Sequence, residues 1–417
     1  MNFTMRMRII YNWAIRTYGA LLFVAQIFSK KAQLWVAGRK DWREKLKIKL
    51  DSNLNGKPVI WVHVSSHGEF EQGKTVIDGL RDNHPNHHIL LTFFSPSGYE
   101  LLKDYSKAHT VSYLPLDTQK QARDFIKIVQ PTIALFVKYE FWYNHLNACF
   151  KSNVPVVFFS SSFRENQVFF RNYGKWFLNH LKQCEHFFVR DGLSDNLLKS
   201  NGITQCSVVG DTRFDAVNRN ANVSKKFPEI GQFIAAKKTL VFGSIWPEDE
   251  QVLLPWLNGL TEDIKIIIAP HEIDLAKINN LCDKIKLSTA LHSGGNYANS
   301  QVLILDCVGV LKHLYQYSSI NYIGGGFGTG IHNLLEPTSY GSPVVFGPNN
   351  HKFMEAKELQ EIGAGYEVND AASFKKTMNK LLVNDKWDST KLNAYFSQNI
   401  GASVKVLKYV EAILQRN

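Results

Sequence analysis

The sequence predicts an α/β protein built from two doubly wound domains, and three observations support this prediction. Short apolar runs rich in β-branched residues alternate with helix-length segments, which is typical of parallel strands buried on both faces. These runs form two successive series. Glycines and charged residues directly follow many of them, where doubly wound proteins place their ligands. At 417 residues and 45% hydrophobic content, the chain can fill two cores.

The predicted strands divide the chain into domains. In the first half they are 59–64, 89–94, 111–114, 133–137, 156–159, 186–189 and 207–209. In the second half they are 239–243, 265–269, 302–305, 320–324 and 344–346. We therefore expect a basic arm at 1–50, one Rossmann-like domain at 51–218, a second at 219–401, and a closing helix at 402–417. The polar, helix-poor stretch 218–227 is the expected join.

The net charge of +11 is concentrated at the N-terminus. Residues 1–50 carry eleven Lys and Arg against two acids, whereas the other 367 residues carry 37 against 35. A nearly neutral body argues against a nucleic-acid partner. The arm also holds the apolar stretch 9–28, whose cleanest part, 18–28, is too short to span a bilayer. We expect an uncleaved helix in or on an anionic membrane surface; the alternative is an amphipathic helix packed on the protein.

The five cysteines are scattered and form no C-x-x-C motif or Cys/His cluster. This pattern predicts a reducing compartment, buried thiols and no zinc site.

The segment 320–353 combines a predicted strand, a glycine-rich turn, a short helix and another strand. The backbone N–H groups of such a turn and the following helix N-terminus can face a phosphate. Asn333 is a candidate helix cap, and Glu336 is placed to accept hydrogen bonds from a ribose diol. The alternative is a tight glycine turn in a core βα unit. The combination favours nucleotide-sugar binding.

Two carboxylates follow predicted strands of the first domain. Glu69 lies at the start of a helix after 59–64, and Glu140 follows 133–137. Together they would form a paired-carboxylate site for abstracting a hydroxyl proton. The alternatives are a helix-dipole partner for Glu69 and a salt-bridged strand edge for Glu140. His67 has no partner acid that the sequence identifies and is a weaker candidate.

Other strand-end motifs suit phosphate and base binding. Arg213 is a candidate to neutralise a leaving phosphate; the alternative is a surface arginine paired with a nearby aspartate. Ser244 is expected to cap the next helix and to be a possible phosphate contact. Pro270 and His271 are expected to form a base-binding wall, and 306–311 is a further strand-end turn.

Six motifs in this order resemble the 3-deoxy-D-manno-octulosonic acid (Kdo) transferases over almost the whole chain. They are Ser66-x-Gly-Glu69, Glu140-Phe-Trp-x-Asn144, Gly210-x-x-Arg213-Phe-Asp215, Ala269-Pro-His271, Asp306-x-x-Gly309-x-Leu311 and Gly325-Gly-x-x-x-x-x-His332-Asn-x-Leu-Glu336. The resemblance implies a GT-B fold, two Rossmann-like domains facing across a cleft. It also implies inverting transfer of Kdo from CMP-Kdo to the lipid A precursor.

The resemblance also implies roles for individual residues. Glu69 matches the proton acceptor, and Glu140 and Arg213 match positions that stabilise the transition state. The implied CMP contacts are Pro270, His271, Gly309, Val310, Leu311, Asn333, Leu334, Leu335 and Glu336. The chain departs from the family where Pro270-His271-Glu272 replaces Pro-Arg-His, Arg213 replaces a lysine, and Trp142-Tyr143-Asn144 replaces Trp-Pro-Asn.

No Asp-x-Asp motif lies near the donor loop, so we expect neither a metal nor another cofactor. The implied location is the cytoplasmic face of the inner membrane of a Gram-negative-type bacterium. Two alternatives stay open at this point. One is a GT-B transferase that uses a UDP-sugar on a lipid-linked acceptor, and the other is a non-catalytic nucleotide-binding membrane scaffold.

Overall fold

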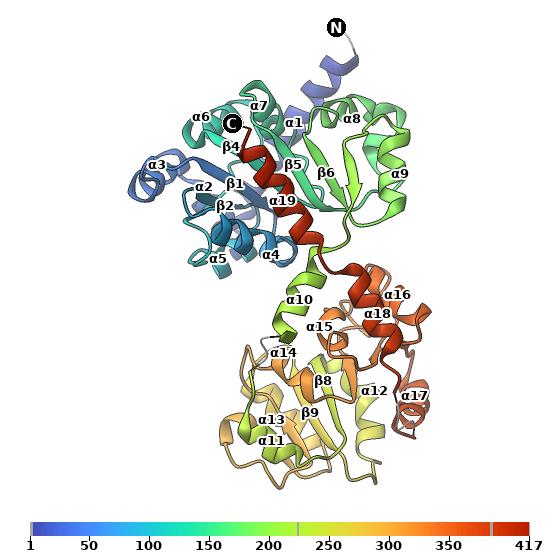
Figure 1. The fold of residues 1–417 in the computed structure, drawn as a ribbon. Helices are drawn as coiled ribbons and strands as arrows, with labels where there is room; N and C mark the ends of the chain where they lie inside the picture. Colours follow the sequence, from blue (N-terminus) through green and yellow to red (C-terminus); the bar gives the residue numbers. More distant parts are fainter. Residues whose placement is uncertain (1–2, 223–224, 384–386, 417) are drawn as a thin grey trace. The chain divides into compact units, whose positions relative to one another are not determined.

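The computed structural model describes residues 3–222, 225–383 and 387–416, which fold into two compact units (Figure 1). Unit 1 comprises Met1–Ala216 and Asn399–Asn417, and unit 2 comprises Val217–Gln398. Each unit is built on a seven-stranded sheet. The predicted α/β class with two Rossmann-like domains is confirmed.

The sheet of unit 1 is parallel, in the order β3-β2-β1-β4-β5-β6-β7. Its strands are β1 (Val59–Val64), β2 (His88–Phe93), β3 (Thr110–Tyr113), β4 (Pro131–Val137), β5 (Val156–Ser161), β6 (His186–Val189) and β7 (Cys206–Val208). Ile60 of β1 pairs with Ile89 on one side and Ile133 on the other. The strand order reverses between β1 and β4, which makes their carboxyl ends the switch point of the sheet.

The helices of unit 1 cover both faces of this sheet. They are α1 (Phe3–Ala25), α2 (Lys30–Arg39), α3 (Trp42–Asn53), α4 (His67–Asn83), α5 (Pro96–Leu102), α6 (Gln119–Val129), α7 (Tyr143–Lys151), α8 (Lys175–Leu181), α9 (Gly192–Ser200) and α19 (Ala402–Leu414). The short 3₁₀ turns η1 (Val168–Phe170) and η2 (Asn172–Gly174) precede α8. Alternation along β1 separates two cores, with Trp61 in one and Ile60 in the other.

The C-terminal helix α19, red in Figure 1, returns to unit 1. Ala402, Val406, Val410 and Ile413 recur at helical spacing and are buried in one core of this unit. Gly79 of α4 lets the two helices approach closely, because a Cβ there would overlap the side chain of Leu407.

The sheet of unit 2 is also parallel, in the order β10-β11-β9-β8-β12-β13-β14. Its strands are β8 (Thr239–Ile245), β9 (Lys265–Pro270), β10 (Thr289–Leu291), β11 (Val302–Ile304), β12 (Ile320–Ile323), β13 (Val344–Phe346) and β14 (Gly365–Glu367). Its switch point lies between β8 and β12. Phe242, Trp256, Tyr322 and Phe374 pack in its core.

The helices of unit 2 include several very short ones. They are α11 (Pro228–Ile234), α12 (Pro247–Leu257), α13 (Leu275–Lys284), α14 (Leu311–Leu314), α15 (Leu335–Thr338), α16 (Met354–Glu361), α17 (Ala371–Val383) and α18 (Thr390–Asn399), with 3₁₀ turns η3 (His292–Gly294) and η4 (Tyr315–Tyr317). The helix α10 (Thr212–Asn222) runs across the division between the units.

Two expectations about elements were wrong. The stretch 218–227 was expected to be helix-poor, but α10 continues to Asn222, because its helical periodicity begins upstream at Phe214 and Val217, which are both buried. The edge strands β10 and β14 were not predicted, since each is three residues long and β10 is only half-buried. Among the described residues, no helix is long and apolar enough to cross a membrane.

Candidate active site

The switch point of unit 1 brings together the two carboxylates that the sequence singled out. Glu69 lies in the first turn of α4, directly after β1, and Glu140 lies in the loop between β4 and α7. Because β1 and β4 are neighbours in the sheet, both residues belong to the same carboxyl edge. The side chains of Glu69 and Glu140 are 18% and 15% exposed, so each carboxylate is partly shielded but reachable by solvent.

Glu69 is held by two donors. Ser66 occupies the N-cap position of α4, but its hydroxyl donates to Glu69 Oε2 and makes no capping bond to the backbone. Lys138 Nζ lies 3.4 Å from Glu69 Oε1. Burial raises the pKa of Glu69, but the Ser66 hydrogen bond and the Lys138 charge outweigh it and hold that pKa below its usual value. Glu69 is therefore a carboxylate at neutral pH.

Lys138 was not among the predicted site residues. It follows β4 with a φ of 61°, in the left-handed region that a residue with a Cβ rarely adopts. Its N–H donates to the carbonyl of Phe159, and its own carbonyl accepts from the Ser161 hydroxyl at 2.7 Å. These bonds to β5 hold the strained backbone in place and direct the ammonium toward Glu69. The only signal in the sequence was a charged residue at a strand end.

Glu140 is oriented by an aromatic and a histidine. Trp142 Nε1 donates to Glu140 Oε2 at 3.0 Å and lies 3.2 Å from His63 Nε2. His63 is fully buried on β1, and its Nδ1 is 2.9 Å from the Thr92 hydroxyl. Burial lowers the pKa of His63 despite the nearby Glu140, so its ring is neutral at neutral pH. Sequence reasoning missed His63, because a histidine inside a buried strand resembles a core residue.

The residues flanking Glu69 on α4 face each other. His67 Nε2 and Glu71 Oε1 are 3.6 Å apart, and both side chains are nearly half exposed. His67 therefore has a carboxylate partner that the sequence did not identify.

Arg213 is engaged with Asp211, as the alternative interpretation of the sequence expected. Its Nε and NH2 lie 2.9 and 2.8 Å from Asp211 Oδ2, and Arg190 NH2 lies 3.2 Å from the same oxygen. Burial alone would raise the pKa of Asp211, but Arg213 and Arg190 outweigh it and lower that pKa to about 2. Two guanidinium groups thus share one carboxylate. Asp215 instead accepts from the backbone at the start of α19.

The segment before Arg213 returns toward α4 although β7 is an edge strand. The Thr212 hydroxyl donates to the carbonyl of Gln72 on α4 and lies 2.7 Å from the Ser160 hydroxyl at the end of β5. Gln72 is one helical turn beyond Glu69. These buried contacts bring the Arg213 segment to the carboxyl edge that carries Glu69.

The switch point of unit 2 holds the predicted donor loops. Ser244 does not cap α12, as had been expected, because it lies inside β8 with a φ of 55° at an irregularity in the β8–β9 register. The cap is Trp246, whose backbone N–H donates to Asp249 Oδ2 at 2.8 Å. The left-handed backbone of Ser244 changes the direction of the chain, so α12 begins later and Trp246 is its cap.

Asp249 fixes the glycine-rich loop after β12. Its carboxylate accepts from the Gly325 N–H at 2.8 Å and from the Tyr322 hydroxyl at 2.7 Å. The loop also packs backbone to backbone, since a Cβ on Gly326 would lie 2.6 Å from Gly347 Cα. Asp249 was not among the predicted site residues, because its fully buried contact with the loop depends on strand order, which the sequence does not state.

The segment after the glycine loop is only partly as expected. Asn333 Oδ1 accepts from the Leu335 N–H at 2.9 Å, as a cap would, but α15 spans only Leu335–Thr338. Such a short helix carries little dipole, so phosphate binding would depend on the loop N–H groups. Leu334 and Leu335 are fully buried and could meet a ligand only through their backbone, whereas Glu336 is half-buried.

Pro270 ends β9, and His271, which follows it, belongs to an aromatic stack. The rings of Trp246 and His271 are stacked at 4.1 Å and those of His271 and His332 at 4.6 Å, and Trp246 Nε1 donates to His332 Nε2 at 3.1 Å. Burial lowers the pKa of both histidines, that of His332 to about 4, so both rings are neutral at neutral pH. Trp246 and His271 also line a cavity of about 230 Å³.

The last predicted donor segment follows β11. Gly309 is exposed with a φ of 86°, and Val310 and Leu311 lead into α14. Since β11, β9, β8 and β12 are consecutive in the sheet, all of the predicted donor loops lie along one carboxyl edge of unit 2. Within residues 3–222, 225–383 and 387–416, no group of three or more His, Cys, Asp and Glu side chains is arranged to hold a metal ion.

Comparison with known proteins shows which family this chain resembles. Residues 40–216 match the family model described as 3-deoxy-D-manno-octulosonic-acid transferase (kdotransferase). The 3-deoxy-D-manno-octulosonic acid transferase of Aquifex aeolicus is 28% identical over 339 residues, covering 80% of this chain and 88% of its own length. The Haemophilus influenzae transferase of the same name is 26% identical over 391 residues, covering 86% and 88%.

A bifunctional glycosyltransferase/methyltransferase of Fusobacterium nucleatum is 25% identical over 87% of this chain, which spans only 58% of that longer relative. Among solved structures, the UDP-GlcNAc 2-epimerase of Neisseria meningitidis has a TM-score of 0.59 at 15% identity, covering 86% of this chain and all of that one. An Anabaena protein in complex with UDP has a TM-score of 0.55 at 11% identity, with the same coverage. At these identities the structures establish the fold alone, in agreement with the GT-B expectation.

The family model covers residues 40–216 of unit 1, which include Glu69 and Glu140, and the relatives are similar over most of the chain. The chain is therefore similar to the 3-deoxy-D-manno-octulosonic acid (Kdo) transferases over most of its length, and this similarity supports a Kdo transferase and thus a glycosyltransferase.

Proposed function

We propose that this enzyme transfers Kdo from CMP-Kdo to the lipid A precursor, lipid IVA, with inversion at the reacting carbon, in lipopolysaccharide core biosynthesis. The observation that carries the proposal is the setting of Glu69. It is an ionised, partly exposed carboxylate at the switch point of unit 1, with its pKa held below the usual value by Ser66 and Lys138 after burial has raised it. A primary alcohol must lose its proton as it attacks, and Glu69 would accept that proton.

Glu140 and Arg213 would stabilise the transition state. Departure of CMP leaves an oxocarbenium-like centre on the sugar and negative charge on the phosphate. The Glu140 carboxylate, fixed by Trp142 at 3.0 Å, would offset the positive centre. The guanidinium of Arg213, which Asp211 holds at 2.8 Å, would offset the charge of the phosphate.

The loops of unit 2 would hold the donor. The neutral rings of the Trp246–His271–His332 stack, together with Pro270, suit a flat, uncharged cytosine base. Glu336 and Asn333 would bind the ribose, while Ser244, residues 309–311 and the glycine-loop N–H groups would contact the phosphate. Leu334 and Leu335 would contribute backbone contacts only. The proposal requires neither a metal nor another cofactor, since the glycine-loop N–H groups and Arg213 would offset the negative charge of the phosphate.

The proposed location is the cytoplasmic face of the inner membrane, with α1 on the anionic surface and no nucleic-acid partner. One side of α1 is tied to unit 1, because the Tyr11 hydroxyl donates to Asp117 at 2.6 Å and Asn144 donates to Asn12 at 3.0 Å. Large apolar side chains are exposed along and just after the helix; they include Ile10, Trp13, Leu21, Phe23, Val24, Ile27 and Phe28. In Figure 1 the N-terminal end of α1 extends beyond the sheet of unit 1. An apolar face flanked by arginines suits an interfacial helix.

Mass spectrometry of the lipid product tests the proposal directly. Incubation with CMP-Kdo and the tetra-acylated lipid A precursor should add the mass of one or more Kdo units to the lipid and release CMP. A Glu69→Gln variant under the same conditions is the control, and it should form much less product than the wild-type enzyme. Absence of product with CMP-Kdo, together with product from a UDP-sugar, would overturn the assignment.

A further inference from the structure

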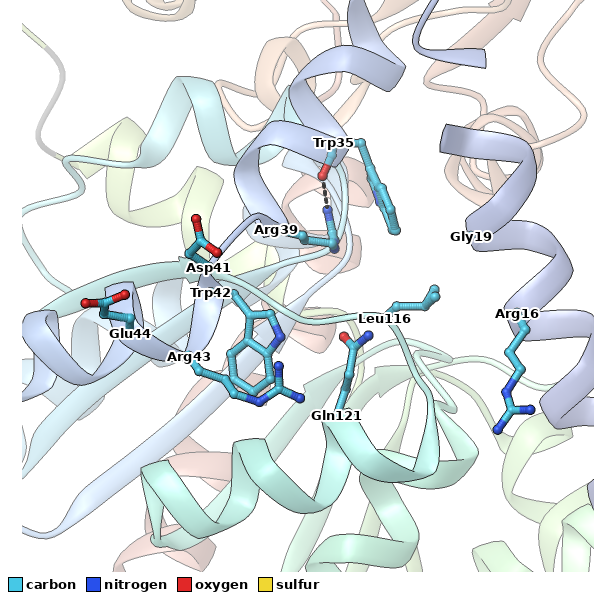
Figure 2. A pocket seen from close by; sticks show the side chains of 10 residues that line it. All are labelled: Arg16, Gly19, Trp35, Arg39, Asp41, Trp42, Arg43, Glu44, Leu116 and Gln121. Atoms are coloured by element: carbon cyan, nitrogen blue, oxygen red, sulfur yellow. Dashed lines mark hydrogen bonds between the residues drawn. The ribbon is translucent and has the colours of Figure 1, made fainter. Parts of the chain in front are cut away.

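A cavity of about 610 Å³ lies in unit 1, between α1, α2, the start of α3 and the segment that leads into α6 (Figure 2). None of the predicted site residues lines it. Its walls combine aromatic side chains with three arginines, namely Arg16, Arg39 and Arg43.

Arg39 is the central feature of this cavity. Only 9% of the residue is exposed, and its guanidinium donates to the carbonyls of Leu114, Trp35 and Phe94 at 2.9, 3.2 and 2.7 Å. No carboxylate pairs with it among the residues that the structure describes. A guanidinium has five N–H donors, and these three bonds leave two for a ligand. Burial lowers the pKa of Arg39 to about 9, and the rings of Trp35, Phe94 and Tyr113 cover its guanidinium at 3.9, 4.8 and 4.9 Å.

The other charges around the cavity are unevenly placed, and its Arg16 end is the positive one. Figure 2 shows Arg16 on α1 at one end, Gln121 and Arg43 nearer the middle, and Asp41 and Glu44 at the end away from Arg16. Arg43 is already paired with Asp124 at 2.7 Å. An anion at the Arg16 end of the cavity would therefore meet a cation and lie away from the two acids.

An apolar compartment adjoins this polar one. Gly19, Trp35 and Arg39 also line a second cavity of about 730 Å³, whose walls include Phe23 and Val36. The two compartments share the Arg39 wall, so one molecule with an anionic group and an alkyl chain could occupy both. A free phosphate ion would use only the first.

The cavity is linked by direct contacts to the candidate catalytic carboxylates. The ring of Trp35 packs on Phe94 at 5.8 Å, and Phe94 stacks on Trp142 at 4.4 Å. Trp142 in turn donates to Glu140. The backbone N–H of Phe94 also bonds to Ser65, four residues before Glu69. A ligand in the cavity would thus lie in the unit that carries Glu69 and Glu140, the residues proposed to act on the acceptor.

We propose that this cavity binds a phosphate group of the lipid acceptor through Arg16 and Arg39, while the adjoining apolar compartment takes one of its acyl chains. The identity of the ligand as the acceptor rests on the proposed function. The anion site itself rests on the burial of Arg39 and its two remaining donors.

The test compares acceptors with and without phosphate, using the full chain in detergent micelles at saturating CMP-Kdo. Wild-type enzyme should show a KM about tenfold lower for the lipid A precursor that carries its phosphates than for the same lipid after phosphatase treatment. Arg16→Glu should reduce this preference to about twofold. Arg6→Glu is the matched control, since Arg6 is exposed on the same helix and outside the cavity, and it should retain the tenfold preference.

Two outcomes would overturn the inference while Kdo transfer proceeds normally. One is that wild-type enzyme has the same KM for the phosphorylated and the dephosphorylated lipid, and the other is that Arg6→Glu and Arg16→Glu reduce the KM difference equally. If neither lipid is glycosylated, the proposed function fails, and calorimetric binding of the two lipids to wild type and Arg16→Glu decides the inference separately. Competition by phosphatidylglycerol as strong as by the phosphorylated acceptor would assign the site to membrane phospholipid and so also overturn it.

Discussion

The Glu69→Gln substitution tests the assignment of the general base. The amide keeps the size of the side chain and can still meet the Ser66 hydroxyl, but it cannot accept a proton. Lys138 loses its anionic neighbour, and because its side chain is 23% exposed, water can solvate the ammonium. The effect on the free energy of unfolding should be small, about 1 kcal/mol or less. A large loss of activity would then reflect chemistry and not misfolding.

The expected loss follows from the proton that the carboxylate removes. General-base assistance is typically worth about 10² to 10⁴ in rate, or about 3 to 5 kcal/mol of barrier. Turnover at saturating CMP-Kdo and acceptor should fall by at least that order. CMP affinity should change little, because Glu69 lies in unit 1 and the proposed contacts to the base and ribose of CMP all lie in unit 2.

Initial rates by mass spectrometry, together with CMP binding by calorimetry, separate these two effects. Glu71→Gln is the matched control: it makes the same chemical change two residues along α4, at a nearly half-exposed side chain that faces His67. This variant and His67→Ala should stay within about twofold of wild type. If Glu69→Gln keeps near-normal turnover while either neighbour is inactive, the base has been assigned to the wrong residue.

The remaining predictions concern the partner of the base, the donor ribose and the N-terminal helix. Lys138→Met should move the acid limb of the kcat/KM profile to higher pH, because it removes a positive charge that lowers the pKa of Glu69. The ionised, active form of Glu69 is lost as pH falls through that pKa, so a higher pKa means an earlier loss of activity. An acid limb at the wild-type pH would contradict this coupling between Lys138 and Glu69. Glu336→Ala should raise the KM for CMP-Kdo with kcat nearly unchanged, since a ribose contact acts equally in ground and transition states; a normal donor KM would refute the contact. Leu21→Ser combined with Phe28→Ser should weaken sedimentation with phosphatidylglycerol vesicles, as should added salt, and unchanged sedimentation would exclude this face.

Strand positions were predictable because burial on both faces leaves a continuous apolar signal. The predicted strand 59–64 coincides with β1, and the helical spacing from residue 402 to 414 coincides with α19. The signal fails where an element is short or half-buried, as for β10. Helix caps cannot be predicted where the backbone conformation overrides the preference of serine for the cap position. Ser244 is an example, since it has a left-handed conformation and the cap of α12 is Trp246.

The supporting residues of the site could not be predicted in the same way, because each acts across the sheet. Lys138 reaches Glu69 only because β1 and β4 are neighbours, and Asp249 reaches Gly325 only because β8 and β12 are. Sequence position reveals which residues end a strand, but not which strands lie side by side. His63 illustrates the limit, since its contact with Trp142 is what distinguishes it from a core histidine.

The N-terminal charge shows how the structure changes the meaning of a sequence count. Residues 1–50 carry eleven cations, but not all of them can face a membrane. Arg39 is buried against backbone carbonyls, Arg43 pairs with Asp124, and Lys49 donates to the carbonyl of Val111 at 2.8 Å. Since a charge engaged within the protein adds little to attraction by anionic lipids, membrane binding should depend on salt less steeply than a net charge of +9 implies. The arm is thus partly a basic surface and partly the wall of a cavity.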